Sequence, residues 1–161
     1  MIDFSKSQDF LTTISNALKE QGITLSDYFI DHICYRVGSM ERYEELKKEL
    51  SQEHTLLHEA MVSNRPIAAY KLKEPILFAG SEIPLLELPA PKPGSSYEEG
   101  FEHAEAVIKE SFTDFAAKYP HIEFDWKGSK KAHNPELRIK LGEVAIKFHH
   151  LSLEEVIAQE K

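Results

Sequence analysis

The sequence predicts an α+β fold made of two similar units, each a strand followed by a helix and three further strands. The order of hydrophobic patterns in the first half of the chain recurs in the second half, and a segment rich in proline and glycine separates the two. Apolar residues at helical spacing near the start of the chain add a helix in front of the first unit. The expected division, within one structural domain, is an N-terminal helical extension (1–29), a first unit (30–91), a linker (92–101) and a second unit (102–161).

The N-terminal extension contains an amphipathic helix. Apolar side chains recur at helical spacing from Phe10 to Leu18, after Ser5, a candidate N-cap, and before Gly22, a typical helix stop. We expect this helix to pack against the rest of the molecule without taking part in chemistry.

The first unit begins with the strand "DHICYRV", residues 31–37. A second helix follows at 39–52, capped by Ser39 and carrying a narrow apolar stripe. Three strands of an antiparallel meander come next, and Pro75 should interrupt pairing in the middle one or create a bulge there. The three meander segments are 54–62, 66–78 and 83–91.

The second unit repeats this order less clearly. A strand at 102–108 precedes a short helix at 111–120, which Pro120 ends. Residues 97–118 also fit one long helix, and in that case the repeat disappears. The remaining predicted elements are strands at 122–130, 135–142 and 143–151 and a final turn or short helix at 152–161.

Composition excludes several classes of function. The formal net charge of −8 argues against binding to nucleic acid, and no apolar run is long enough to span a bilayer. Cys34 is the single cysteine among 161 residues, so no disulfide forms within the chain. The N-terminal residues lack the apolar core of a secretory signal. These features predict a cytoplasmic protein without a membrane or nucleic-acid partner.

Superposing the two units brings candidate functional residues together. The first strands align His32 with His103, and each histidine follows an acidic residue. The last strands align Glu87 with Lys147, and His149 lies two positions further on the same face. On the first strand, alternation places His32, Cys34 and Arg36 on one face.

The layout resembles the vicinal-oxygen-chelate superfamily, which includes glyoxalase I and the extradiol dioxygenases. The sequence is also similar to the bacterial YecM proteins, a branch of that superfamily. The resemblance implies a cupped, incomplete barrel built from two βαβββ modules. The stretches that carry it are "DHICYRV", "RPIAAYKLKEP", "ELPAPK", "EGFEHAE", "NPELRIK" and "IKFHHLSLEEVI", which cover most of residues 30–160.

The resemblance implies a metal site. Superfamily ligands come from the first and last strands of each module, and they fall on His32, Glu87 and His103. The fourth falls on Lys147, and a protonated lysine does not coordinate a cation. His149 replaces it if the strand bulges. Two imidazoles and a carboxylate suit a divalent ion, either iron, zinc or manganese.

Other residues take roles around this site. We expect Glu105, on the His103 face, to act as a base or to support a ligand, and Lys147 to face an anionic substrate or an oxyanion. Strand parity does not decide whether Tyr70 or Lys71 points into the cavity, nor whether His149 or His150 does. The expected substrate-binding side chains are Arg36, Tyr70 and His149.

The expected function is a metal-dependent enzyme acting on a small, oxygen-rich anionic molecule. Isomerase, lyase and dioxygenase chemistry all remain open. One alternative is a metal-free binding protein that uses the same cavity, and another is an interaction protein with an exposed strand edge. The protein is expected to be either a monomer or a homodimer.

Overall fold

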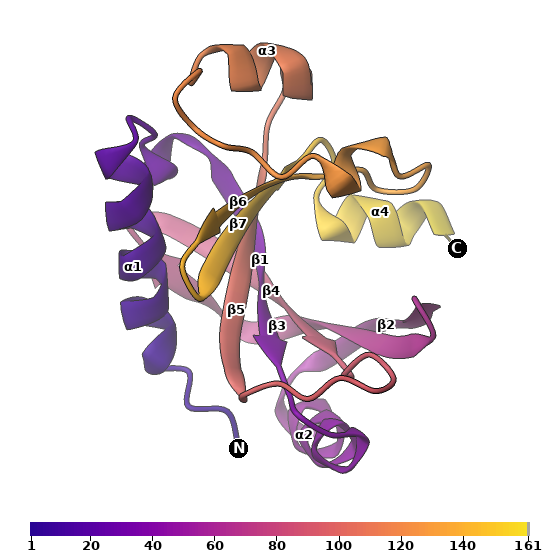
Figure 1. Ribbon diagram of the computed structural model, residues 1–161. Coiled ribbons are helices and arrows are strands. Elements are labelled where there is room, and N and C mark those ends of the chain that lie inside the picture. The colour runs from indigo at the N-terminus through magenta and orange to yellow at the C-terminus, as the bar shows by residue number, and fades with distance from the viewer. Residues whose placement is uncertain (161) are drawn as a thin grey trace.

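A computed structural model of the protein, which describes residues 1–160, contains one curved seven-stranded sheet (Figure 1). The strand order is β2-β3-β4-β1-β5-β7-β6. The two edge strands, β2 and β6, lie at opposite ends of this order, so the sheet remains open. The prediction of an α+β fold with a cupped, incomplete barrel is therefore confirmed.

The first unit has the expected order of elements, and the N-terminal helix stands in front of it. The break predicted at Pro75 is confirmed, because the register between β3 and β4 shifts between Lys71 and Ile76. The elements are α1 (Lys6–Glu20), the 3₁₀ turn η1 (Leu25–Asp27), β1 (Phe29–Arg36), α2 (Met40–Glu53), β2 (Thr55–Val62), β3 (Arg65–Phe78) and β4 (Ser81–Pro89).

The second unit begins with a strand and not with the alternative long helix over 97–118. Its elements are β5 (Gly100–Val107), α3 (Phe112–Ala117), the 3₁₀ turn η2 (Lys127–Lys130), β6 (Leu137–Leu141), β7 (Val144–His149) and α4 (Leu153–Glu160). The second unit thus has one strand fewer than the first.

The predicted strand over 122–130 is wrong. This segment makes a single isolated bridge to β6, through Asp125, and then turns into η2. Local hydrogen bonds replace a strand ladder here. The Asp125 carboxylate accepts from the Lys127 amide at 3.0 Å, and the Ser129 hydroxyl donates to the Trp126 carbonyl at 2.7 Å.

Strand pairing joins the two units through their first strands. Within the first unit β1 runs parallel to β4, and within the second β5 runs parallel to β7. Between the units, β1 and β5 pair antiparallel, with Ile33 opposite Ala104 near the centre. The histidines predicted from the repeat therefore lie on adjacent strands in the middle of the sheet.

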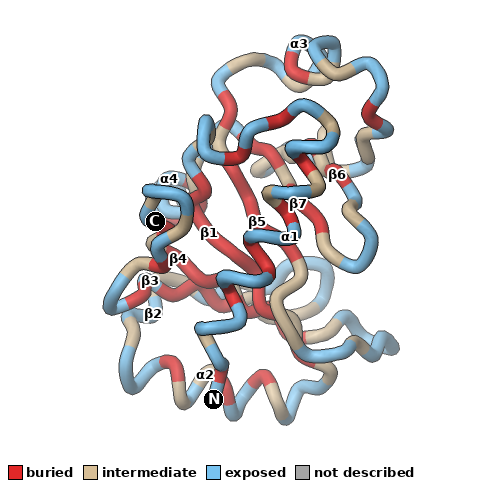
Figure 2. Tube along the Cα trace, turned by 90° about the vertical axis from the view of Figure 1, so that its left-hand side faces the viewer, coloured by how far each residue is buried: buried red, intermediate tan, exposed pale blue. Residues whose placement is uncertain are grey.

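The two faces of the sheet differ in character. The main apolar core includes buried side chains of both α1 and α2, and Figure 2 shows buried positions along the central strands. Helix α4 lies in the opening of the curved sheet (Figure 1), where Leu153 and Ile157 pack on Ala69 and Leu85. No helix among residues 1–160 is long and apolar enough to cross a membrane.

The two serines predicted as helix caps behave differently. The Ser39 hydroxyl accepts a hydrogen bond from the Arg42 amide at 3.1 Å and caps α2. Ser5 makes no side-chain bond to α1, and its hydroxyl donates to the Asp3 carboxylate instead. The prediction is thus confirmed for Ser39 and wrong for Ser5.

Replacing Ser39 by alanine should lower the free energy of unfolding by about 1 kcal/mol, because the Arg42 amide loses its acceptor. The matched change Ser5→Ala should cost clearly less. Urea denaturation of both variants checks this. Equal losses would show that the cap of α2 contributes nothing of its own.

Candidate metal centre

Two β-bulges interrupt the pairing of β1 with β5. On β1 the extra residue is Asp31, since its neighbours Ile30 and His32 pair with the consecutive residues Ala106 and Glu105. A bulge of this kind breaks the alternation of side chains between the two faces. It allows Asp31 and His32, which are consecutive in sequence, to contact each other and the same cluster of side chains.

The second bulge is the counterpart of the first in the other unit. Glu102 is the extra residue on β5, between His103, which pairs with Cys34, and Phe101, which pairs with Tyr35. An acidic bulge residue therefore precedes each of the two aligned histidines.

Each acidic bulge residue holds the histidine that follows it. Asp31 Oδ2 lies 2.8 Å from Nδ1 of His32, and a Glu102 oxygen contacts Nδ1 of His103. A carboxylate on one ring nitrogen fixes the orientation of the imidazole and directs the other nitrogen outward from that contact. Both Nε2 atoms are thereby aimed at the same place.

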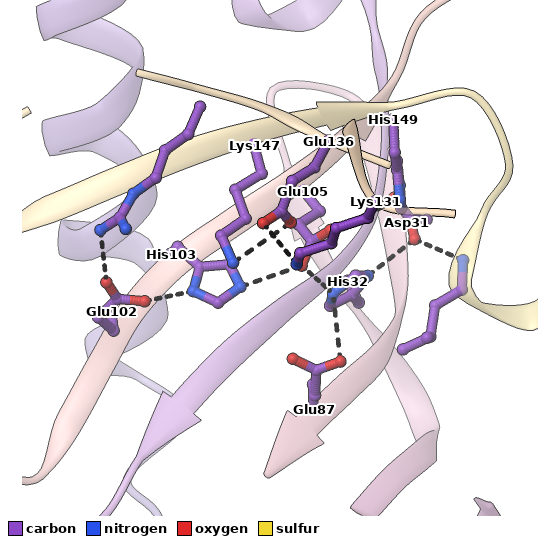
Figure 3. A network of polar contacts seen from close by, with 12 residues as sticks. Asp31, His32, Glu87, Glu102, His103, Glu105, Lys131, Glu136, Lys147 and His149 are labelled. Carbon is purple, nitrogen blue, oxygen red and sulfur yellow. Dashed lines mark hydrogen bonds and ion pairs between the residues drawn. The ribbon is translucent and has the colours of Figure 1, made fainter. Parts of the chain in front are cut away.

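Glu105 lies between the two histidines. Its Oε2 is 2.9 Å from Nε2 of His32 and 3.0 Å from Nε2 of His103. Glu87 approaches from β4, with Oε2 at 3.9 Å from Nε2 of His32. The four side chains each offer a ligand atom, and these atoms all lie within 4.8 Å of one another (Figure 3).

This donor set fits a divalent ion. Two imidazole nitrogens and two carboxylates are ligands that zinc, iron and manganese accept, and the Nδ1 partners supply the outer support that metal-bound histidines usually have. His32, His103 and Glu105 are buried, while the Glu87 side chain is 18% exposed. Of the four side chains, that of Glu87 is therefore the most exposed.

Asp31 also connects the cluster to the end of the chain. Its Oδ1 accepts a hydrogen bond from Nε2 of His149 at 2.7 Å, and its Oδ2 accepts one from the Leu153 amide at 2.8 Å. His149 is fully buried, with Nδ1 at 3.5 Å from Oε1 of Glu105. His150 faces away and stacks on Phe112, so His149 is the inward residue of the pair.

Lys147 lies at the position that matches Glu87 when the two units are superposed, and the strand pairing shows where the second unit carries its carboxylate. In the first unit Cys34 of β1 pairs with Glu87 of β4, and in the second Glu105 of β5 pairs with Lys147 of β7. The carboxylate thus lies on the last strand in one unit and on the first strand in the other. The cluster keeps two carboxylates even though Lys147 is not a ligand.

Opposite charges face one another within the cluster. Both ring nitrogens of His32 and of His103 face carboxylates, which only accept hydrogen bonds, so both rings are protonated in this arrangement. Burial opposes the charge on His32, but Glu105 and Asp31 outweigh burial and raise its pKa well above the usual range. Burial also opposes ionisation of Glu105, and His32 and His103 hold its pKa well below the usual range.

Lys147 is charged as well. Burial works against its charge, but Glu105, Glu136 and Glu87 together raise the pKa of its ammonium group. The Lys147 Nζ atom lies 3.3 Å from Oε2 of Glu136, and Nζ of Lys131 lies 3.1 Å from Oε1 of the same residue.

Two predicted substrate-binding residues lie outside this cluster. The Tyr70 hydroxyl donates to the Lys47 carbonyl of α2 at 2.9 Å and also contacts Ser51, so it belongs to the helix-covered face. The Arg36 guanidinium lies 4.5 Å from the ring centre of Tyr97, in the linker. The structure brings neither to the two histidines.

Comparison with known proteins places this geometry in a family. A family model described as YecM protein matches residues 3–160. The chain belongs to the YecM family. Protein YecM of Escherichia coli K12 is 29% identical over 167 aligned residues, which cover 94% of this chain and 89% of that protein. An uncharacterised protein of Haemophilus influenzae is 34% identical over 110 residues, covering 66% of this chain and 58% of that protein.

Solved structures extend the comparison beyond the YecM family. A structural genomics protein superposes with a TM-score of 0.83 at 28% identity, covering 99% of this chain and 92% of its own. A methylmalonyl-CoA epimerase gives a TM-score of 0.53 at 14% identity, covering 75% and 93%. Such epimerases are members of the vicinal-oxygen-chelate superfamily, so the predicted fold relationship is confirmed.

Sequence reasoning missed several members of the cluster. Asp31, Glu102 and Glu136 were not predicted as site residues, and Glu105 was not predicted as a ligand candidate. The acidic residue before each aligned histidine was a usable signal for the first two. Glu136 lies in a segment that was predicted to begin a strand, and no pattern in the sequence brings it to Lys147.

The contact of Glu102 with His103 makes stability depend on pH. Burial alone would raise the pKa of Glu102, but His103 outweighs it and lowers that pKa from 4.5 to about 2. A carboxylate with a lowered pKa stabilises the fold fully above its unfolded pKa, and this contribution disappears as the pH falls from about 4.5 towards 2.

The native chain should lose about 3 kcal/mol of unfolding free energy through this group as the pH falls, which is the pKa shift converted to free energy. Glu102→Gln should not show this part of the loss. Denaturant unfolding of chelator-treated protein between about pH 6 and 2.5 measures it. The exposed Glu123→Gln serves as the control and should leave the limb unchanged. Parallel curves for Glu102→Gln and the native chain would contradict the assignment.

Proposed function

We propose that this protein is a metal-dependent enzyme of the vicinal-oxygen-chelate type. The observation that carries the proposal is the convergence of His32, Glu87, His103 and Glu105 within 4.8 Å in the middle of the sheet. Each histidine has a carboxylate on its other nitrogen, an arrangement typical of metal ligands. The proposed ion is iron, zinc or manganese, which this donor set suits.

The proposed substrate is a small, oxygen-rich anion. A divalent ion at this centre would act as a Lewis acid on two neighbouring substrate oxygens. The substrate reaches the cluster on the Glu87 side, and the Lys147 ammonium group attracts its negative charge. Asp31 holds His32 and His149 in place, while His149 packs beside Glu105 and limits its movement.

The reaction class is an isomerase, a lyase or a dioxygenase, and the identity of the ion separates these. Zinc has no redox chemistry, so a zinc protein would carry out proton transfer as an isomerase or lyase. A donor set of two histidines with carboxylate also occurs in iron enzymes that use dioxygen. The same side chains orient the substrate in either case.

Protein purified without a tag and without chelator should contain about one equivalent of metal, and His103→Ala should lose most of it. Elemental mass spectrometry measures both. His121→Ala, which changes an exposed histidine bonded to the Gln21 carbonyl, should keep the metal. Circular dichroism should show that all three proteins are folded.

A metal-free binding protein is the second candidate, and the hydrogen bonds within the cluster favour it. Protonated His32 and His103 satisfy Glu105, Asp31 and Glu102 without an ion. Metal absent from the native chain, even after reconstitution with divalent cations, would overturn the enzyme proposal in favour of this one.

Glu105→Gln tests whether Glu105 is a ligand or a base. As a ligand it is needed for binding, so we expect metal affinity to fall at least tenfold, as it should for Glu87→Gln. Competition with a chromophoric chelator measures both affinities. Retention of full affinity in Glu105→Gln alone would assign the residue to proton transfer instead.

A further inference from the structure

A loop of the second unit, residues 128–136, contacts the cluster through Glu136. It follows the segment 122–127, and a hydrogen bond of 3.0 Å from the Glu136 amide to the Gly128 carbonyl closes it. Figure 3 shows Lys131 and Glu136 in one network of polar contacts with Lys147, Glu105 and the two histidines.

The loop delivers a carboxylate to two ammonium groups. Oε2 of Glu136 lies 3.3 Å from Nζ of Lys147, and Oε1 lies 3.1 Å from Nζ of Lys131. The Glu136 side chain is 13% exposed and that of Lys147 is 19% exposed, while Lys131 is half-exposed. The Glu136 carboxylate thus bridges the mostly buried Lys147 and the solvent-facing Lys131. Lys147 is the one of the two that pairs with Glu105 of the proposed metal centre.

Gly128 makes room for this carboxylate. A Cβ atom at Gly128 would lie 2.4 Å from Cγ of Glu136 and 2.6 Å from its Oε1, closer than real Cβ contacts. The backbone of Gly128 is not in the left-handed region. Glycine is therefore needed here because a side chain would not fit, and not because of the backbone conformation. The loop is therefore shaped around the side chain of Glu136.

We infer that Lys147 and Lys131 form an anion subsite beside the metal centre, and that Glu136 fills it until a substrate carboxylate takes its place. This inference rests on the proposed function and names its substrate class. The substrate carries a carboxylate on the lysines and a second oxygen group, a carboxylate or an oxo group, directed at the proposed ion.

The exchange is reasonable in charge and in geometry. One carboxylate replaces another on the same two ammonium groups, so the net charge of the subsite is conserved and no buried cation is left unpaired. The side chain of Glu136 can leave while its backbone bond to Gly128 keeps the loop in place. Glu136 is thus a competitor that every substrate anion has to displace.

Malonate, a small dicarboxylate, is a suitable probe, and isothermal titration calorimetry measures its affinity. Glu136→Gln removes the competing charge and should bind malonate about tenfold more tightly than the native chain. Gly128→Ala displaces the same carboxylate without changing the charge, and it should shift the affinity in the same direction. Lys147→Met should lose most of the affinity.

Two controls isolate the subsite. Glu123→Gln removes one exposed negative charge and should bind malonate as the native chain does. Malonamide, the uncharged analogue, should gain nothing from Glu136→Gln. An equal gain for Glu123→Gln or for malonamide would overturn the inference, because the effect would then come from net charge or from space alone.

The metal content of each variant separates this inference from the proposed function. Native-like metal in Glu136→Gln without tighter malonate binding would overturn the subsite and leave the metal enzyme intact. Tighter binding that persists in chelator-treated protein would support the subsite even if the native chain held no metal.

Discussion

The buried carboxylate of Asp31 is the group on which the centre of this molecule depends. A charge removed from water costs several kcal/mol unless partners compensate for it. Asp31 receives hydrogen bonds from His32, His149 and the Leu153 amide, which belong to β1, β7 and α4. Burial works against ionisation of Asp31, but His32 and His149 outweigh it and hold its pKa below the usual range. Removing any one donor would leave part of a buried charge unpaired, so the three elements are held to one arrangement.

The layout of strands and helices followed from the sequence because local patterns and the repeat agree. Residues 10–18 of α1 and the stripe of α2 show helical spacing, and the two histidines that the repeat aligns lie on first strands, β1 and β5, in the structure. Alternation of side chains along a strand predicts the wrong face for Asp31 and Glu102. Each is the extra residue of a β-bulge, and no pattern of hydrophobicity in the sequence reveals such a bulge. The strand expected over 122–130 failed for a different reason. Local side-chain bonds at Asp125 and Ser129 outweigh its strand propensity.

Lys147 shows that matching positions in the two units carry opposite charges. Glu87 and Lys147 occupy matching positions on β4 and β7, yet Glu105, one strand away, returns a carboxylate to the cluster. The pairing of Glu105 with Lys147 makes this substitution favourable, since neighbouring strands place the two opposite charges close together. Equivalence between the units is therefore clearer in the cluster as a whole than at single aligned positions. A sequence alignment of the two units places Lys147 opposite Glu87, but it does not show that Glu105 supplies a carboxylate to the cluster.

The hydrogen bonds of Asp31 to His149 and to Leu153 span 118 and 122 residues, almost the length of the chain. Helix α4 adds Glu160, which contacts His58 of β2 and His133 in the segment before β6, so α4 connects the two units at this point as well. A ribosome synthesises α4 long after Asp31, and contacts between distant residues form slowly. The first unit can assemble as it emerges, but Asp31 gains its full set of partners only after β7 and α4 have been synthesised. Completion of the centre is thus a late step in the life of a newly made chain.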